Sequence, residues 1–244
     1  MKRFFLEICV ESLPSALAAQ RGGANRVELC AQLDIGGLTP AEWLTSEVID
    51  ALAIPVHVLI RSRGGDFMFT PGELELMKRQ IRWVKRAGAA GVVVGVAHAD
   101  GRIDVNRSRE LVELARPMQV TFHRAFDETP EKFEALEAVI ATGADCLLTS
   151  GGAADVLAGA ATIARLARQA GQRIQIMAGG GLRLTNLVQV LRRSEVSTLH
   201  GSLSRRPMRP LSANPAEALE ADVRDAVGLL QSELGALDTA AQGS

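Results

Sequence analysis

The chain has 244 residues, 47% of them hydrophobic, and a formal net charge of −1 from 27 basic and 28 acidic side chains. This balance lacks the basic excess by which proteins neutralise nucleic-acid phosphates, and no apolar run reaches the ~18 residues that cross a bilayer. With no signal-like N-terminus and three cysteines that lack a disulfide spacing, we expect a protein of the reducing cytoplasm, without nucleic-acid or membrane partners.

Strand-like and helix-like segments alternate along the whole chain. The expected strands cover residues 4–10, 25–30, 55–61, 91–96, 118–123, 145–150, 174–179 and 197–201. Helical patterns are expected between and after them, at 12–21, 40–51, 72–87, 104–115, 130–142, 154–170, 184–192 and 214–233. Eight strands, each followed by a helix, predict an α/β fold, a single-domain (β/α)8 TIM barrel over residues 1–234.

A doubly wound sheet is the alternative, because the same alternation of strands and helices builds both folds. The count of eight strands favours the barrel, as does the lack of a glycine-rich phosphate turn after the first strand. No linker rich in Pro, Gly or Ser divides the pattern, so one domain is expected. Residues 235–244 are predicted to form a disordered C-terminal tail.

The first two expected strands carry the same motif. Each alternates apolar and polar residues and ends in Glu-x-Cys. Successive strand side chains point to opposite faces, so Glu7 shares a face with Cys9, and Glu28 shares one with Cys30. If the two strands pair in parallel, two thiols and two carboxylates converge at their C-terminal ends.

The parity of other strands adds polar side chains to this end. Positions that face the helices must be apolar, and inward positions at the C-terminal strand ends build the active sites of TIM barrels. The side chains expected at one mouth are Glu7, Cys9, Glu28, Cys30, Arg61, His123 and His200. His57 is expected deeper in the third strand, in a structural role, and Cys146 is expected to pack at the opposite end.

The two cysteines have two interpretations. Neighbouring strands lie ~4.8 Å apart, and two thiolates at such a separation suit a soft metal such as Cu(I), or Zn(II) with further ligands. Alternatively, both are small buried hydrophobic residues.

The two glutamates need partners, because an unpaired buried carboxylate is costly. Arg61 is the expected counter-ion, with Arg26 or Arg124 as alternatives. Glu7 and Glu28 then form either a structural ion network or a general acid/base pair whose pKa values are pushed apart by proximity.

Residues after the strands offer further candidates. His123 is followed by Arg124 and Asp127, which favours a functional role, whereas His200 has fewer charged neighbours and stays open. Arg61 and Arg63, in a loop with Gly64, Gly65 and Asp66, suit an anion clamp or a solvated turn. Glycine-rich segments at 150–152, 179–181 and 200–202 lie where many barrels bind phosphate, although glycine also serves simply to turn the chain.

Several sequence blocks together resemble the CutC family, described as cytoplasmic copper homeostasis proteins. They lie at residues 7–12, 21–30, 36–40, 60–67, 121–127, 148–151 and 179–181. The resemblance implies a TIM barrel that forms a homo-oligomer (a dimer or tetramer), with Cu(I) held by Cys9 and Cys30 and no organic cofactor.

Two functions therefore compete. The first is a CutC-like copper homeostasis protein that binds Cu(I) at the barrel mouth. The alternative is a TIM-barrel enzyme of unknown reaction that acts on a small anionic or phosphorylated substrate. In that enzyme Glu7, Glu28 and His123 would be catalytic, and the substrate would be bound by Arg61, Arg63, Asp66, Arg124, Asp127, Ser150, Gly180 and His200. An oligomeric scaffold is a third hypothesis without a positive signal.

Overall fold

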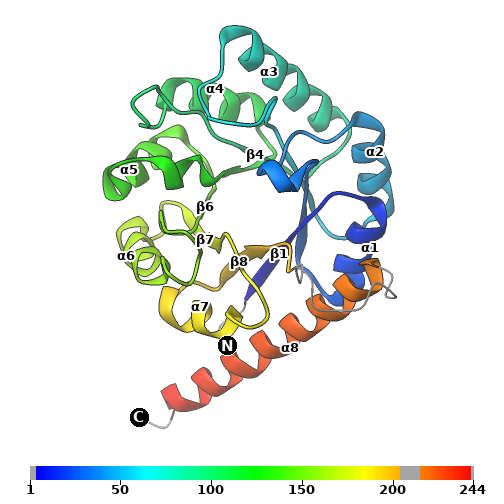
Figure 1. Cartoon of the computed structure of the whole chain (residues 1–244), viewed down its shortest axis with the longest axis vertical. Coiled ribbons are helices and arrows are strands. Elements are labelled where there is room, and N and C mark those ends of the chain that lie inside the picture. Colours follow the sequence, from blue (N-terminus) through cyan, green and yellow to red (C-terminus); the bar gives the residue numbers. More distant parts are fainter. Residues whose placement is uncertain (1–3, 204–214, 243–244) are drawn as a thin grey trace.

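The strands of the computed structural model, which describes residues 4–203 and 215–242, close into an eight-stranded parallel barrel in chain order (Figure 1). The β1 strand pairs with both β2 and β8, so the predicted TIM barrel is confirmed and the doubly wound sheet is excluded. The strands are β1 Phe5–Val10, β2 Arg26–Leu29, β3 Val56–Leu59, β4 Gly91–Val94, β5 Gln119–Phe122, β6 Cys146–Thr149, β7 Gln175–Gly179 and β8 Thr198–Gly201.

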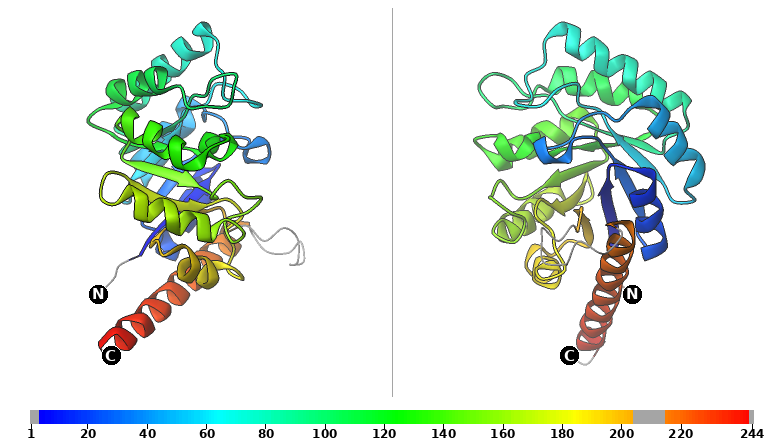
Figure 2. Two further views of the ribbon diagram at one scale, coloured as in Figure 1. Left: turned by 90° about the vertical axis from the view of Figure 1, so that its left-hand side faces the viewer. Right: turned by 45° about the vertical axis from the view of Figure 1, so that its right-hand side comes forward.

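Eight α-helices of the described residues surround the barrel, and each follows one strand (Figures 1 and 2). They are α1 Leu13–Gly22, α2 Glu42–Ala51, α3 Pro71–Arg86, α4 Val105–Ala115, α5 Lys132–Thr142, α6 Ala160–Ala170, α7 Leu187–Ser194 and α8 Pro215–Gln242. Two short 3-10 helices, η1 Leu33–Ile35 and η2 Arg124–Glu128, follow β2 and β5.

Local sequence signals explain several helix starts. The first turn of α3 has a capping box, in which Thr70 Oγ1 accepts from Glu73 N–H and the Glu73 carboxylate accepts from Thr70 N–H. The α6 helix begins six residues later than expected, because Asp155 Oδ1 accepts the N–H groups of Leu157 and Ala158 and holds a turn there.

The α8 helix is longer than expected and continues to Gln242, through most of the segment predicted to be a disordered tail. Residues 235–242 include three alanines, a leucine and a glutamine, which favour a helix, and they extend α8 beyond the barrel (Figure 2). Residues 243–244 lie outside the described part of the chain.

The strand parity predicted from the sequence is confirmed. Outward side chains such as Leu6 and Ile8 join the large core between sheet and helices, whereas Cys9, Cys30, Leu59 and Val93 form a separate small cluster. In the register, Cys9 lies beside Glu28 and Glu7 beside His200. Parallel strands end together, so these inward side chains meet at the C-terminal mouth of the barrel.

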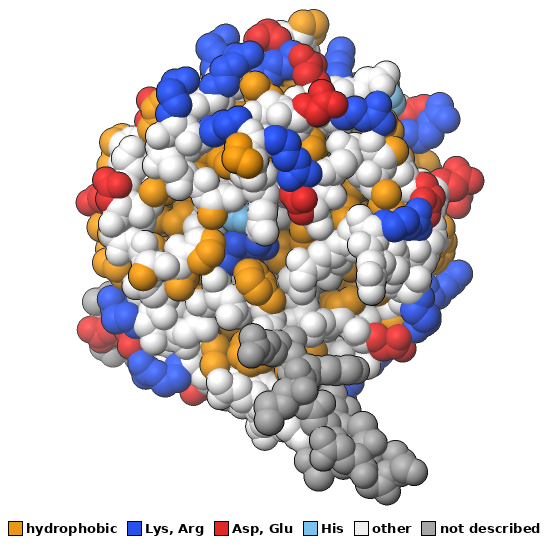
Figure 3. All heavy atoms as spheres, turned by 180° about the vertical axis from the view of Figure 1, so that it is seen from behind, with side chains coloured by type: hydrophobic (Ala, Val, Ile, Leu, Met, Phe, Trp, Pro, Cys, Tyr) orange, Lys and Arg blue, Asp and Glu red, His pale blue; other side chains and the backbone are white. Residues whose placement is uncertain are grey.

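The outer surface carries charges of both signs. On the face opposite to that of Figure 1, basic and acidic side chains are interspersed around the edge (Figure 3). Within the described ranges, no helix is long and apolar enough to cross a membrane.

Candidate functional site at the barrel mouth

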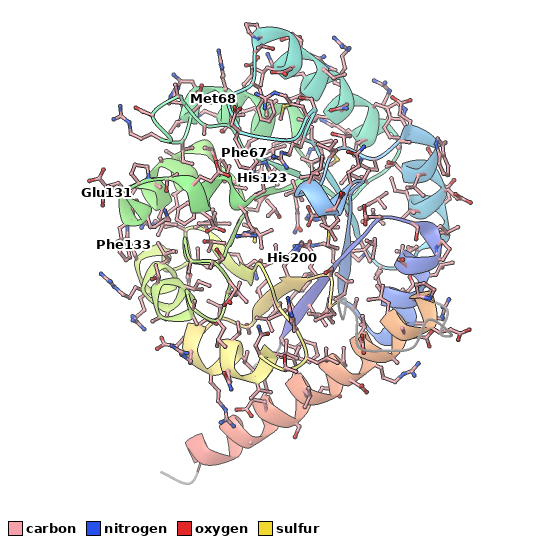
Figure 4. The ribbon with its side chains drawn as sticks, in the orientation of Figure 1. Phe67, Met68, His123, Glu131, Phe133 and His200 are labelled. Carbon is pink, nitrogen blue, oxygen red and sulfur yellow. The ribbon has the colours of Figure 1, made fainter. Side chains whose placement is uncertain are left out.

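The C-terminal ends of the strands and their loops enclose a cavity of about 240 Å³. Figure 4 shows Phe67 and His123 side by side at the mouth, with His200 across the barrel from them. We call this space the mouth cavity. It is lined by Cys9, Glu28, Cys30, Leu33, Gly36, Gly37, Leu59, Arg61, Phe67, His123, Arg124, Leu148, Gly180, Gly181, His200, Gly201 and Ser202.

Two cysteines lie next to each other in this cavity, as the motif predicted. Cys9 is inside β1, and Cys30 directly follows β2, where its N–H donates to Val10 O and continues the strand pairing. Their Sγ atoms are 3.3 Å apart, and both residues are buried. The hydrogen bond with Cys30, burial and the Glu28 charge raise the pKa of Cys9 well above its usual value. Cys9 is therefore a thiol at neutral pH until a partner displaces its proton.

Glu28 and His200 form an acid–imidazole pair beside the thiols. His200 Nε2 is 3.4 Å from Glu28 Oε2, and potential ligand atoms of Cys9, Glu28 and His200 all lie within 4.8 Å of one another. Burial, reinforced by the Glu7 charge, raises the pKa of Glu28 to about 7. The pKa of His200 is also raised, because the charges of Glu28 and Glu7 outweigh burial. The pKa values of both partners are thus shifted upward, that of Glu28 by burial and that of His200 by the carboxylates that face it.

Glu7 lies behind this pair and does not line the mouth cavity. Its Oε1 is 2.7 Å from His200 Nδ1, and its Oε2 accepts from Arg26 Nε. Although burial would raise the pKa of Glu7, the His200 hydrogen bond and the Arg26 charge lower it to about 2. Glu7 is accordingly a permanent carboxylate that orients His200.

The expected counter-ion of Glu7 was wrong. Arg26, the alternative counter-ion, pairs with Glu7, and Arg61 does not. The register explains this result, because Arg26 is the direct partner of Glu7 and shares the inward face with Glu28. His200, whose role the sequence left open, contacts both carboxylates.

Arg61 instead reaches the loops above the barrel. Its Nη1 donates to Ile35 O and Gly37 O at 3.3 and 3.2 Å, and its Nη2 donates to Gly65 O. The guanidinium stacks on the Phe67 ring, with 4.6 Å between its Cζ and the centroid. Arg61 is only 5% exposed and makes no ion pair with a described residue, while its Nε has no hydrogen-bond partner there.

His123 is buried next to Arg61. Its Nδ1 accepts from Ala125 N–H at 3.2 Å, so in the neutral ring Nε2 carries the proton, and Nε2 has no partner among the described residues. Burial, and then the Arg61 charge, lower the pKa of His123 to about 3. This environment favours a neutral hydrogen-bond donor over the predicted proton-transfer role.

The remaining predicted site residues separate into two groups. Arg63 binds Asp66 and Glu73 at 2.8 Å and holds its own loop, outside the mouth cavity. Asp127 accepts from the Ser150 N–H and hydroxyl, so these two residues join η2 to the loop after β6. Two others do line the cavity, namely Arg124 and Gly180.

The sequence interpretation overlooked Phe67 and the loop around Gly36 and Gly37 as cavity-lining residues. Phe67 belongs to the block at 60–67, and its place two residues beyond the Gly64-Gly65 pair was the only signal. The inward parity of Arg26, shared with Glu28, was a stronger signal for the partner of Glu7.

The fold and the mouth define a class of protein: a TIM barrel with a cavity that contains adjacent thiols and charged side chains at the C-terminal end of its strands. The model of the CutC family matches residues 4–205, and the chain belongs to the CutC family. This confirms the resemblance seen in the motifs.

The comparisons include two sequence relatives and one solved structure. A family protein CutC of Chromobacterium violaceum is 47% identical over 197 residues, covering 81% of this chain and 80% of the relative. The human copper homeostasis protein cutC homolog is 44% identical over 199 residues, covering 82% and 73%. The crystal structure of a CutC protein from Streptococcus agalactiae has a TM-score of 0.78 at 28% identity and covers 82% of this chain and 100% of that one.

Proposed function

We propose that this chain is a copper homeostasis protein that binds Cu(I) between Cys9 and Cys30. The observation that carries the proposal is the 3.3 Å separation of their Sγ atoms in the mouth cavity. Soft thiolate ligands select Cu(I), and the human relative bears the name of a copper homeostasis protein.

The geometry of the thiol pair suits one shared ion. Two metal–sulfur bonds of ~2.3 Å, the length known for zinc, span at most ~4.6 Å. The two sulfur atoms are closer than this limit, so one ion reaches both. Glu28 and His200 add harder donors within the same group, which makes Zn(II) the competitor that the site must discriminate against.

An anaerobic competition titration with a chromophoric Cu(I) chelator tests this proposal. We expect the Cys9→Ser/Cys30→Ser variant to bind Cu(I) roughly 100-fold or more weakly than wild type, beyond what changes outside a ligand set cost. The matched control is Cys146→Ser, which alters a third buried cysteine that packs against Leu148 and Met177 outside the thiol pair. Equal affinity in the double variant, or equal losses in both variants, would remove the thiol pair as the copper site.

We further propose that the protein acts in the cytoplasm and assembles as a homo-oligomer, a dimer or tetramer. The three free cysteines support a reducing compartment. Light scattering coupled to size-exclusion chromatography measures the assembly, and a monomeric mass would refute the oligomer.

The Glu28–His200 pair favours a second candidate function, acid–base catalysis on a small anionic substrate. A group with a pKa of about 7 that faces a cavity is well placed to accept or donate a proton at neutral pH. The test is ¹H NMR of a library of small carboxylates and phosphate esters in D₂O, with wild type and Glu28→Gln. Product formation or deuterium uptake with wild type alone supports this candidate function. If no compound shows either change, the candidate function is refuted.

A further inference from the structure

We infer that the mouth cavity contains a binding subsite for a small organic anion, in which Arg61 supplies the charge and His123 Nε2–H a hydrogen bond. The inference deepens the second candidate function, because it names the ligand class of the shared cavity. It does not depend on copper binding.

The first argument is the charge balance inside the barrel. Glu7 forms an ion pair with Arg26, and Glu28 faces His200 at 3.4 Å. Arg61 forms no ion pair with a described residue and is buried against three backbone carbonyls, while the carboxylates of Glu128 and Asp66 act on it only from beyond ion-pair distance. A buried charge without a counter-ion is costly, so an anion in the cavity would stabilise this arrangement.

The second argument is the pair of unused donors. Arg61 Nε and His123 Nε2 are buried, and neither has a hydrogen-bond partner among residues 4–203 and 215–242. Both residues line the mouth cavity, and the Phe67 ring lies against both, 4.6 Å from the Arg61 Cζ and 4.8 Å from the His123 ring. A carboxylate or phosphate group offers several acceptor oxygens to such neighbouring donors.

The mouth cavity is open to anions from solution beside Arg124. Arg124 also lines the cavity, is 44% exposed along its side chain, and lies against Gly180, where a Cβ would come within 2.9 Å of its Cζ. A second guanidinium at the cavity, partly open to solvent, attracts anions from solution. Asp127 pairs with Arg124 at 2.7 Å and weakens the attraction of Arg124 for anions. Arg61 is therefore the main anion-binding group.

The size and polarity of the cavity narrow the ligand class. A volume of about 240 Å³ is below the ~300 Å³ at which sites for drug-sized ligands begin. The Glu28–His200 pair and the thiols line the cavity together with Arg61 and His123, and His200 lies across the mouth from His123 (Figure 4). The ligand is therefore a small molecule with a carboxylate or phosphate at one end and a polar group at the other.

Isothermal titration calorimetry of metal-free protein with malonate and with inorganic phosphate tests the subsite. We expect wild type to bind at least one probe, and the better probe tells whether carboxylate or phosphate is preferred. Arg61→Gln should weaken binding roughly tenfold or more, because a charged hydrogen-bond partner is lost. The matched control is Arg102→Gln, an exposed arginine paired with Asp100, which should bind like wild type. Binding of neither probe, or equal binding by Arg61→Gln, would overturn the inference.

Replacing Arg61 also removes hydrogen bonds that hold the loops above the barrel. His123→Asn therefore provides a second test that leaves these hydrogen bonds in place. The shorter amide can still accept from Ala125 N–H, but it removes the Nε2 donor. We expect several-fold weaker binding and, in wild type, probe-dependent shifts of the His123 imidazole signals in long-range ¹H–¹⁵N spectra. The exposed His98 is the internal reference and should not shift. Unmoved His123 signals at probe saturation would exclude it from the subsite. Failed binding refutes only the anion site, since the proposed catalysis is judged by turnover and the copper site by chelator competition.

Discussion

The two ends of the barrel interior are built from the same strands and both contain a buried arginine, yet the two arginines are paired differently. At the N-terminal end, Arg26 binds Glu7 and approaches His57 and Gln119, so the charges there have partners within the protein. At the C-terminal mouth, Arg61 has no carboxylate partner in the described part of the chain, and a cavity remains. Charged residues inside a barrel therefore indicate a binding site where a charged group lacks an ion-pair partner and a cavity lies beside it.

His200 connects these two ends. Its Nδ1 contacts Glu7 of the N-terminal network, and its Nε2 faces Glu28 in the mouth cavity. Glu7 of the N-terminal network thus orients the His200 imidazole at the mouth. Substitutions at the N-terminal end should mainly cost stability, whereas substitutions at the mouth should mainly cost binding.

The largest expected effect is that of Arg26→Met at the N-terminal end. Removing Arg26 from this buried ion pair leaves the Glu7 carboxylate with His200 as its remaining close partner and should cost about 3–5 kcal/mol in the free energy of unfolding. Chemical denaturation measures this loss. Adding Glu7→Gln to the same chain should recover part of it, and a loss under about 1 kcal/mol would show that the network is not satisfied as described.

The second largest difference between the two ends is expected in the stability cost of adding a methyl group to a glycine at each end. A Cβ at Gly91 would lie 2.3 Å from His57 Nε2, and a Cβ at Gly95 would lie 2.5 Å from His123 Cε1. Gly91→Ala should cost about 1–3 kcal/mol, because His57 is enclosed by the N-terminal network. Gly95→Ala should cost less, since His123 can shift toward the mouth cavity. Denaturation of both is compared with Gly72→Ala, whose Cβ meets nothing within 4 Å; equal costs at 91 and 95 would contradict the comparison.

A pH effect of intermediate size is expected from His57. Burial, and then the Arg26 charge, lower its pKa from 6.5 to about 4. Because the unfolded state takes up the proton first, His57 contributes stability above pH 6.5 that is lost as the pH falls toward 4. The stability difference between wild type and His57→Gln should fall by up to about 3 kcal/mol over this range. Denaturation at several pH values measures it, and a constant difference would mean that His57 does not titrate this way.

The smallest effect is expected outside both ends. Arg168 and Glu195 form an ion pair 2.6 Å long, but both side chains are more than half exposed. Solvent and salt screen such a pair, so Arg168→Gln should not change the denaturation midpoint measurably. A clear loss would mean that surface charges, and not only the interior networks, set the differences above.

Much of the fold could be predicted because it depends on local periodicity. The alternation in Glu7–Cys9 and Glu28–Cys30 placed the thiols and carboxylates on the inward face, and the structure confirms that face. Eight repeats of strand and helix were enough to identify the barrel. The end of α8 at Gln242 was missed because a composition that suits a frayed end suits a helix equally well.

The charge partners depended on the tertiary structure. Whether Arg26 or Arg61 binds Glu7 is set by the stagger between neighbouring strands and by the loops that β3 enters, and periodicity contains neither quantity. Arg61 lies two residues beyond the end of β3, where its backbone pairs with Thr39 and its side chain turns to loop carbonyls.

By itself, then, the sequence determined the barrel, the inward face of five of its strands and the end at which the thiols gather, because these follow from spacing along one chain. Only the tertiary structure decided that His200 bridges two carboxylates, that Arg61 forms no ion pair with a described residue and that a cavity remains beside it. Those features arise from distances between residues far apart in the chain and from the volume that their packing leaves unfilled.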